Sequence, residues 1–200
     1  KKGFITCYTL EKSGQQEFQL EHADYKKRLK KFKPIYAKIL IRHNTNIALN
    51  KRQAKNILFV HTELKKLGIK LLLEVLVKQP LTLQAVKELQ AAGVKPDIWK
   101  LAGMDKLKDW QRIAQAVVKA NSRARIIILG GGDSTQKVER WLKTAAKIPE
   151  VIGFAIGRTI FQQPLVTYQQ RKINKPQTID QIMKNYLYFV KVFEKEKRRG

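Results

Sequence analysis

The sequence predicts an α/β protein built on a parallel sheet. Short apolar runs alternate with longer segments of helical periodicity along most of the 200 residues. Successive apolar runs begin 26 to 34 residues apart, which is the length of one strand–helix unit. Repeated units of this kind build either a doubly wound sheet or a closed barrel. No GxGxxG motif follows the first strand, which argues against a dinucleotide-binding sheet.

Each strand is predicted from a short apolar run that is bounded by polar residues or glycine. The six predicted strands are residues 4–10, 36–41, 70–77, 97–101, 125–129 and 151–156. No low-complexity segment and no Ser/Gly linker divides the chain. We therefore expect one domain over residues 1–200.

The helices are predicted from apolar residues spaced three and four apart. They cover residues 17–32, 51–67, 81–92, 105–120, 134–147 and 179–196. Gly68 and Gly93 follow two of them, where a C′ glycine ends a helix. Asp133 is the expected N-cap of the fifth helix, with Gln136 three residues later as in a capping box. In the last helix, an apolar stripe predicts packing against the core: Ile179, Ile182, Met183, Tyr186, Leu187 and Val190.

The composition is strongly basic. Lys and Arg number 41 against 16 Asp and Glu, so the formal net charge is +25 and the pI is near 10.2. Such a charge attracts polyanions. However, the two densest runs, residues 26–31 and 195–199, lie on amphipathic helices, where we expect solvated faces. No zinc-finger, RRM or helix-turn-helix signature accompanies them, so we expect no specific nucleic-acid partner.

Several other classes of protein are disfavoured. No apolar run approaches the roughly 18 residues of a membrane helix. The first residues are too few and too polar for a signal peptide. The single cysteine, Cys7, excludes an internal disulfide and a cysteine-based zinc cluster. We expect a cytoplasmic protein without membrane association, metal or cofactor, and the sequence leaves homo-oligomerisation open.

Charged side chains interrupt three consecutive apolar strands. Glu74 lies in LLLEVLV, Lys100 in DIWKLAG, and Lys38 and Arg42 in YAKILIR. An unpaired buried charge costs roughly several kcal/mol, so these groups must be paired, and a structural ion-pair network is one interpretation. In a barrel, the same side chains would converge at the carboxyl mouth, where barrel enzymes hold their active sites. We expect Glu74, Lys100, Lys38 and Arg42 to share one cavity.

Glycine turns follow the last two strands. Gly130, Gly131 and Gly132 precede one helix, and Gly157 is followed by Arg158. Glycine amides and helix N-termini favour anions, and arginine captures them in a bidentate manner. A plain tight turn is the alternative for the triple glycine alone. Together the two turns predict a phosphate site.

Five segments resemble a known family: LEKSGQ at 10–15, and residues 36–44, 71–77, 95–105 and 153–160. The chain resembles the carboxy-terminal domain of fused 5-dehydro-2-deoxygluconokinase proteins of inositol catabolism. That domain is similar to class I tagatose-bisphosphate and fructose-bisphosphate aldolases. The resemblance implies a (β/α)8 TIM barrel, of which this chain supplies strands 3 to 8 while the first two βα units are missing. It also implies cleavage of 6-phospho-5-dehydro-2-deoxygluconate to dihydroxyacetone phosphate and malonate semialdehyde.

The resemblance implies a role for each residue. Lys100 matches the lysine that forms the Schiff base, Glu74 the general acid/base, and Lys38 a further catalytic lysine. Gly130 to Gly132 and Gly157-Arg158 match the phosphate turns, and Arg42 is expected to bind substrate. The nearby cations Lys38 and Arg42 would favour the neutral amine of Lys100 that imine formation requires.

Two rival functions remain: a non-catalytic sugar-phosphate-binding or regulatory barrel, and a basic protein associated with nucleic acid. The three histidines do not group by spacing. We expect His22 and His61 on helix surfaces, and His43, which follows Arg42, beside the pocket.

Overall fold

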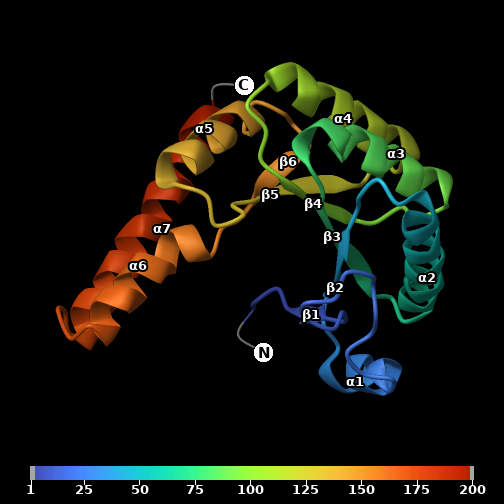
Figure 1. Cartoon of the computed structure of the whole chain (residues 1–200), viewed down its shortest axis with the longest axis horizontal. Coiled ribbons are helices and arrows are strands. Elements are labelled where there is room, and N and C mark those ends of the chain that lie inside the picture. The colour runs from blue at the N-terminus through green and yellow to red at the C-terminus, as the bar shows by residue number, and fades with distance from the viewer. Residues whose placement is uncertain (1–2, 199–200) are drawn as a thin grey trace. The chain divides into compact units, whose positions relative to one another are not determined.

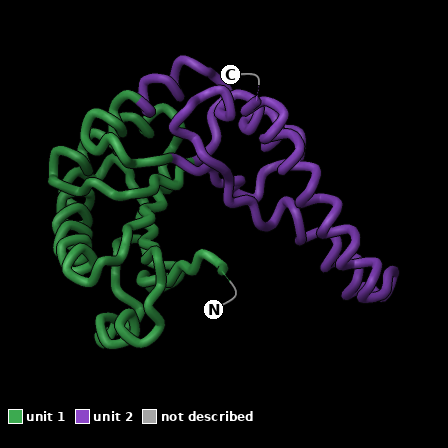
Figure 2. Tube along the Cα trace, turned by 180° about the vertical axis from the view of Figure 1, so that it is seen from behind, with its two compact units in different colours: residues 1–101, 115–125 green, residues 102–114, 126–200 purple. Residues whose placement is uncertain are grey.

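The computed structural model describes residues 3–198, and the fold is a parallel α/β fold (Figure 1). Six parallel strands take their chain order in one sheet and alternate with helices. The contacts within the chain divide it into two compact units: residues 1–101 with 115–125, and residues 102–114 with 126–200 (Figure 2). The predicted fold class is therefore confirmed.

All six predicted strands are present. They are β1 (Cys7–Thr9), β2 (Tyr36–Arg42), β3 (Lys70–Leu76), β4 (Ile98–Ala102), β5 (Arg125–Leu129) and β6 (Val151–Ala155). β1 is shorter than the expected 4–10, because only Cys7 to Thr9 pair with β2. Phe4 and Ile5 precede it with about three quarters of their surface exposed, 78% and 73%.

Side-chain alternation gives the sheet of the first unit two different faces. Ala37, Ile39 and Ile41 of β2 are buried, whereas Lys38 and Arg42 on the opposite face are only partly buried. Leu71, Leu73 and Val75 of β3 repeat the first pattern. The helix α2 (Ile47–Lys66) packs on β2 and β3. We call the opposite face, which carries Lys38, the inner face.

The helices of the first unit differ from the prediction in two places, and one of them is the start of α2, which begins at Ile47, four residues before the expected 51. α1 covers only Tyr25–Phe32, so the expected helix over 17–32 is wrong for its first half. Residues 10–21 form a loop, closed by an antiparallel bridge between Glu11 and Leu20. Phe18 is buried in this loop, and its N–H donates to the Gln53 side chain. That anchor replaces the helical hydrogen bonds that the periodicity of the segment predicted.

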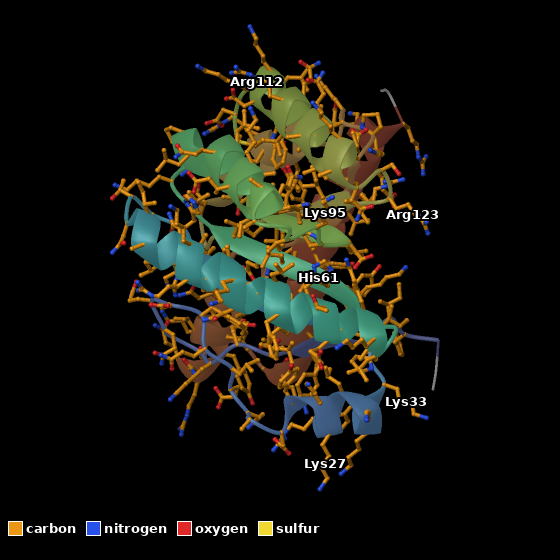
Figure 3. All side chains as sticks on the ribbon, turned by 90° about the vertical axis from the view of Figure 1, so that its right-hand side faces the viewer. Lys27, Lys33, His61, Lys95, Arg112 and Arg123 are labelled. Carbon is orange, nitrogen blue, oxygen red and sulfur yellow. The ribbon has the colours of Figure 1, made fainter. Side chains whose placement is uncertain are left out.

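The first unit also contains α3 (Thr82–Ala91), preceded by a 3-10 turn at Gln79–Leu81. The next helix, α4 (Leu107–Ala120), is divided between the units, since its residues up to 114 belong to the second. The charged run at 26–31 lies on α1 and is mostly exposed, as expected. Lys27, Lys33, Lys95 and Arg123 are likewise exposed side chains of the first unit (Figure 3).

The second unit contains α5 (Thr135–Ala145), α6 (Arg158–Gln169) and α7 (Lys175–Lys197). Ser134 caps α5 by accepting from the Lys137 N–H, so the expected Asp133 cap is wrong by one residue. α6 was not predicted, and it contains Pro164. α7 begins four residues earlier than expected, at a capping box formed by Asn174 and Gln177.

The apolar stripe predicted on α7 does not form the core. Ile179, Met183, Tyr186 and Leu187 keep between 42% and 55% of their surface exposed. α7 instead buries Thr178, Phe189 and Phe193, on the side that packs against α5 and α6. A helix with apolar residues on two sides can bury either side, and α7 buries the side that carries Phe189 and Phe193.

Candidate active site

The strand register brings three of the predicted site residues together on the inner face. Glu74 of β3 pairs in register with Lys100 of β4 on one side and with Leu40 of β2 on the other. Lys38 lies two residues before Leu40 and therefore points to the same face. All three side chains stand at neighbouring positions of adjacent parallel strands.

Their charged atoms meet at one carboxylate oxygen. Lys100 Nζ donates to Glu74 Oε2 at 3.0 Å, and Lys38 Nζ lies 3.4 Å from the same oxygen. The Glu74 side chain is only 9% exposed, and those of the two lysines are 18% and 19% exposed. A carboxylate this close to an amine can take or return its proton directly.

Glu11 completes the cluster, and the sequence analysis did not assign it a role. Lys38 Nζ also forms an ion pair with Glu11 Oε1, while Glu11 Oε2 is buried without a hydrogen-bond partner. Glu11 lies two residues past β1, in the loop that its bridge to Leu20 closes. Two signals were available for Glu11: it is a carboxylate just beyond the carboxyl end of a strand, and it lies in the LEKSGQ segment that resembles the aldolase-like domain.

The cluster of Glu11, Lys38, Glu74 and Lys100 is balanced in charge, with two carboxylates and two ammonium groups. Balance matters here because each desolvated ion costs several kcal/mol unless a partner offsets it (roughly). We refer to these four residues as the inner-face cluster. All four belong to the first unit.

Arg42 and Cys7 border the cluster. Arg42 Nε donates to the Gln15 carbonyl at 3.2 Å, and Arg42 and Glu11 line one small pocket. Arg42 therefore lies beside Glu11, at one side of the cluster. Burial raises the pKa of the Cys7 thiol, although the ammonium groups of Lys38 and Lys100 act in the opposite direction.

In the second unit, the two predicted glycine turns lie against each other. Gly131 and Gly132 have positive φ angles of 64° and 83°, which side chains rarely adopt. The Arg158 guanidinium donates to the Gly131 carbonyl at 2.6 Å. It also lies so close to Gly132 that an added Cβ would stand 2.7 Å from Arg158 Cζ. The Thr159 hydroxyl donates to the Asp133 carbonyl at 2.9 Å, which ties the two turns together.

Two helices begin at these turns. α6 starts at Arg158 with Gly157 as its N-cap residue, and Gly157 has no side chain to cap the helix. α5 starts one residue after Ser134. Gly130 is buried, since a Cβ there would meet Ile156 at 3.1 Å. Free amides at helix starts attract anions, so the expected phosphate site remains a prediction for these residues.

The histidines differ from expectation. His61 is buried, not at the helix surface, and burial lowers its pKa from 6.5 to about 4 (Figure 3). His43 is buried as well, with Nε2 2.7 Å from Glu88 Oε2. It borders a groove between α2 and α3, not the inner-face cluster. His22 lies just before α1 and is partly buried.

Between residues 3 and 198, no group of three or more His, Cys, Asp or Glu side chains is arranged to hold a metal ion. Within the same range, no helix combines the length and apolar character needed to cross a membrane.

Sequence comparison places the chain in a family. The profile described as "Uncharacterized protein conserved in bacteria (DUF2090)" matches residues 2–197. The chain belongs to this DUF2090 family. No curated protein matches the chain.

Solved structures share its fold. A fructose-bisphosphate aldolase from Plasmodium falciparum, solved with TRAP and a small-molecule inhibitor, superposes with a TM-score of 0.66 at 13% identity. The protein Cgl0159 from Corynebacterium glutamicum gives 0.61 at 14% identity, and the YdjI aldolase from Escherichia coli K12 gives 0.50 at 13%. The matches cover 96%, 90% and 90% of this chain, but 68%, 63% and 63% of the other chains. At such identities the likeness establishes an aldolase-like fold.

Proposed function

We propose that this DUF2090 chain is a Schiff-base aldolase-like lyase that cleaves a carbon–carbon bond in a phosphorylated keto sugar acid. The observation that supports this most directly is the 3.0 Å contact between Lys100 Nζ and Glu74 Oε2. A lysine amine next to a carboxylate, on the inner face of a parallel sheet, provides a nucleophile and its proton acceptor together. The aldolase-like fold supports the same reaction class.

The proposed reaction begins when Glu74 accepts a proton from the Lys100 ammonium. The free amine adds to the substrate ketone and forms a carbinolamine. Glu74 returns the proton to the carbinolamine oxygen, water leaves, and an iminium ion results. Glu74, ionised again, accepts the proton of the hydroxyl on the β carbon. The bond between the α and β carbons breaks, its electron pair moves into the iminium to give an enamine, and the β carbon leaves as the aldehyde product. Protonation of the enamine and hydrolysis release the second product and restore Lys100.

Lys38 supports this chemistry through its charge. Its ammonium lies 3.4 Å from Glu74 Oε2, where it attracts the negative charge of the carboxylate that accepts the first proton. Glu11 in turn pairs with Lys38 and keeps that ammonium in place. We assign Lys38 as catalytic and Glu11 as a positioning residue. Arg42 is the proposed contact for a polar group of the substrate.

The phosphate is assigned separately to the second unit. Gly130, Gly131, Gly132, Gly157 and Arg158 lie at the starts of two helices, where amides and a guanidinium favour an anion. Arg158→Ala should weaken the binding of phosphorylated ligands without changing the reactivity of Lys100.

The substrate we propose is 6-phospho-5-dehydro-2-deoxygluconate. Support for it comes from the resemblance of residues 10–15, 36–44, 71–77, 95–105 and 153–160 to the aldolase-like domain of inositol catabolism. We propose in addition that the protein acts in the cytoplasm and without a cofactor. These details rest on the sequence motifs alone.

Borohydride trapping tests the mechanism. The full chain is incubated with dihydroxyacetone phosphate and sodium borohydride, and the adduct is located by peptide mass spectrometry. We expect modification of Lys100 and none in Lys100→Ala or Lys100→Arg, because a guanidinium does not form the imine. Lys70→Ala is the matched control, since Lys70 lies on the same face of β3 at its amino end.

Three outcomes separate the alternatives. Adduct on Lys100 supports the proposal, and adduct at Lys38 in place of Lys100 overturns the assignment. Saturable binding of the sugar phosphate without any adduct supports a non-catalytic sugar-phosphate-binding barrel. In every case Lys70→Ala should behave as the unmodified chain does.

A further inference from the structure

A groove between α2 and α3 lies apart from the inner-face cluster. It is bordered by the helices on the opposite side of the sheet and has a volume of about 540 Å³. Sites for small organic molecules typically measure about 300–1,000 Å³. The groove belongs entirely to the first unit, on the side that Figure 3 shows.

The sequence explains why this space is open. Ile47, Ala54 and Leu58 recur along one face of α2, at spacings of seven and four residues. Opposite them, α3 ends in Ala91 and Ala92, whose methyl groups are too short to fill the space between the helices. Ile47, at the start of α2, is 67% exposed, so apolar surface is left uncovered along the groove.

One side of the groove is positively charged. Lys51 and Lys55 lie four residues apart on α2, both are exposed, and both line the groove. Neither forms an ion pair within the part of the chain that the structure describes. Two unpaired ammonium groups next to apolar surface suit a ligand that is both apolar and anionic.

The other side is polar and already satisfied. Glu88 accepts hydrogen bonds from Gln84 at 2.7 Å and from the buried His43, also at 2.7 Å. These bonds lower the pKa of the Glu88 carboxyl, so it is ionised at neutral pH. A negative group on a ligand would be repelled there and attracted to Lys51 and Lys55, which fixes the orientation of the ligand in the groove.

We propose that the α2–α3 groove is a binding site for a free small molecule with an apolar, ring-sized body and one carboxylate or sulfonate group. The body lies between Leu58 and the two alanines of α3, and the acid lies at Lys51 and Lys55. The site is independent of the proposed aldolase chemistry, because none of its lining residues belongs to the inner-face cluster.

A matched pair of dyes tests this. 8-Anilinonaphthalene-1-sulfonate carries the acid, and N-phenyl-1-naphthylamine has a similar body without it. We expect saturable one-to-one fluorescence binding of the sulfonate by the full chain. In the double variant Lys51→Gln/Lys55→Gln, the sulfonate should bind at least about fivefold more weakly at low salt, and the neutral dye less than twofold more weakly. In Ala91→Leu, which fills the groove, both dyes should bind at least about fivefold more weakly.

Controls separate the groove from other surfaces. Lys191→Gln/Lys195→Gln removes two exposed lysines with the same spacing from α7, and Ala48→Leu adds the same bulk to α2 outside the groove. Neither control should change binding. Sulfonate binding that survives Ala91→Leu, or falls equally in the Lys191/Lys195 control, overturns the proposal. Loss of dye binding in Met183→Ser also overturns the proposal, because it would mean that the dye binds the exposed apolar side of α7.

Discussion

Neutralising Glu74 should destabilise the first unit, because its carboxylate separates two ammonium groups. At an effective dielectric constant of about 20, each contact, at 3.0 Å and 3.4 Å, is worth about 5 kcal/mol of attraction. Desolvation of the ions offsets most of this, and removing one partner of a buried pair typically costs about 3–5 kcal/mol. Lys38 and Lys100 keep almost a fifth of their side-chain surface in solvent, and Lys38 retains Glu11. We therefore expect Glu74→Gln to lower the free energy of unfolding by about 2–3 kcal/mol.

The assay is urea unfolding followed by circular dichroism at neutral pH, in a double-mutant cycle with Lys100→Met. Lys100→Met alone leaves Glu74 paired with Lys38, and the double variant removes one charge of each sign. The coupling energy between the two changes should be about 1–2 kcal/mol, the size found for directly contacting groups. Asp133→Asn is the control, because its pair with Lys137 is much more exposed and should contribute less than about 1 kcal/mol.

Two results would refute this reasoning. One is a Glu74→Gln chain within about 0.5 kcal/mol of the unmodified one, the range of an ordinary surface change. The other is a coupling energy near zero, which would mean that Glu74 and Lys100 do not sense each other in solution. A loss that vanishes at high salt would place the pair in solvent, because buried pairs are only weakly screened.

Three further predictions concern stability. The pKa of His61 is about 4 in the folded chain, below its ordinary 6.5, so the folded chain binds fewer protons than the unfolded chain in this range. The stability should therefore fall as the pH drops from about 6.5 to 4. In His61→Leu, the melting temperature should depend less on pH over this range. Phe189 is 1% exposed, so Phe189→Ala should lower the free energy of unfolding in urea by about 3–5 kcal/mol. Met183 is 48% exposed, so Met183→Ser should change it by less than about 0.5 kcal/mol. Gly103→Ala should lower the melting temperature sharply, since its Cβ would stand 2.2 Å from a buried indole ring, whereas Gly153→Ala meets nothing within 4 Å and should melt like the unmodified chain.

Strands were predictable where burial is strong. The segment 125–129 matches β5 at both ends, because three isoleucines and Leu129 form an apolar run between Arg125 and Gly130. The first strand was predicted too long because apolar character alone does not create pairing. Phe4 and Ile5 are apolar, yet only Cys7 to Thr9 find partners on β2.

Helix predictions were wrong where the local sequence pattern disagreed with the tertiary structure. α6 was not predicted. It contains Pro164, which removes one helical hydrogen bond and crowds the carbonyl four residues earlier, so its local sequence disfavours the helix that forms. Residues 17–24 were assigned to a helix on periodicity, but the buried Phe18 and its bond to Gln53 hold an irregular loop instead. Phe18 and Gln53 are 35 residues apart, so no local sequence pattern reveals the hydrogen bond between them.

The site residues that lie on strands could be predicted from the alternation of side chains, whereas the residue in a loop could not. Lys38, Glu74 and Lys100 each interrupt an apolar strand, and alternation together with parallel pairing is sufficient to place all three on one face. Glu11 lies in a loop, where no alternation applies, so its contact with Lys38 depends on how that loop closes at Leu20. Arg42 was placed on the right face, yet its guanidinium turns to the Gln15 carbonyl of the same loop.

The loop therefore decides the electrostatics of the cluster. Without Glu11, one carboxylate would face two ammonium groups, and the excess positive charge would favour a neutral lysine. With Glu11 present, the four charges balance, and Lys38 has a carboxylate partner of its own besides Glu74. Glu11→Gln should accordingly make Lys100 more nucleophilic, while Glu11→Ala should also let Lys38 move. The rate of borohydride-dependent labelling of Lys100 at one fixed, neutral pH measures this, and faster labelling in Glu11→Gln is expected. An unchanged rate would mean that Glu11 holds the loop and does not affect the reactivity of Lys100.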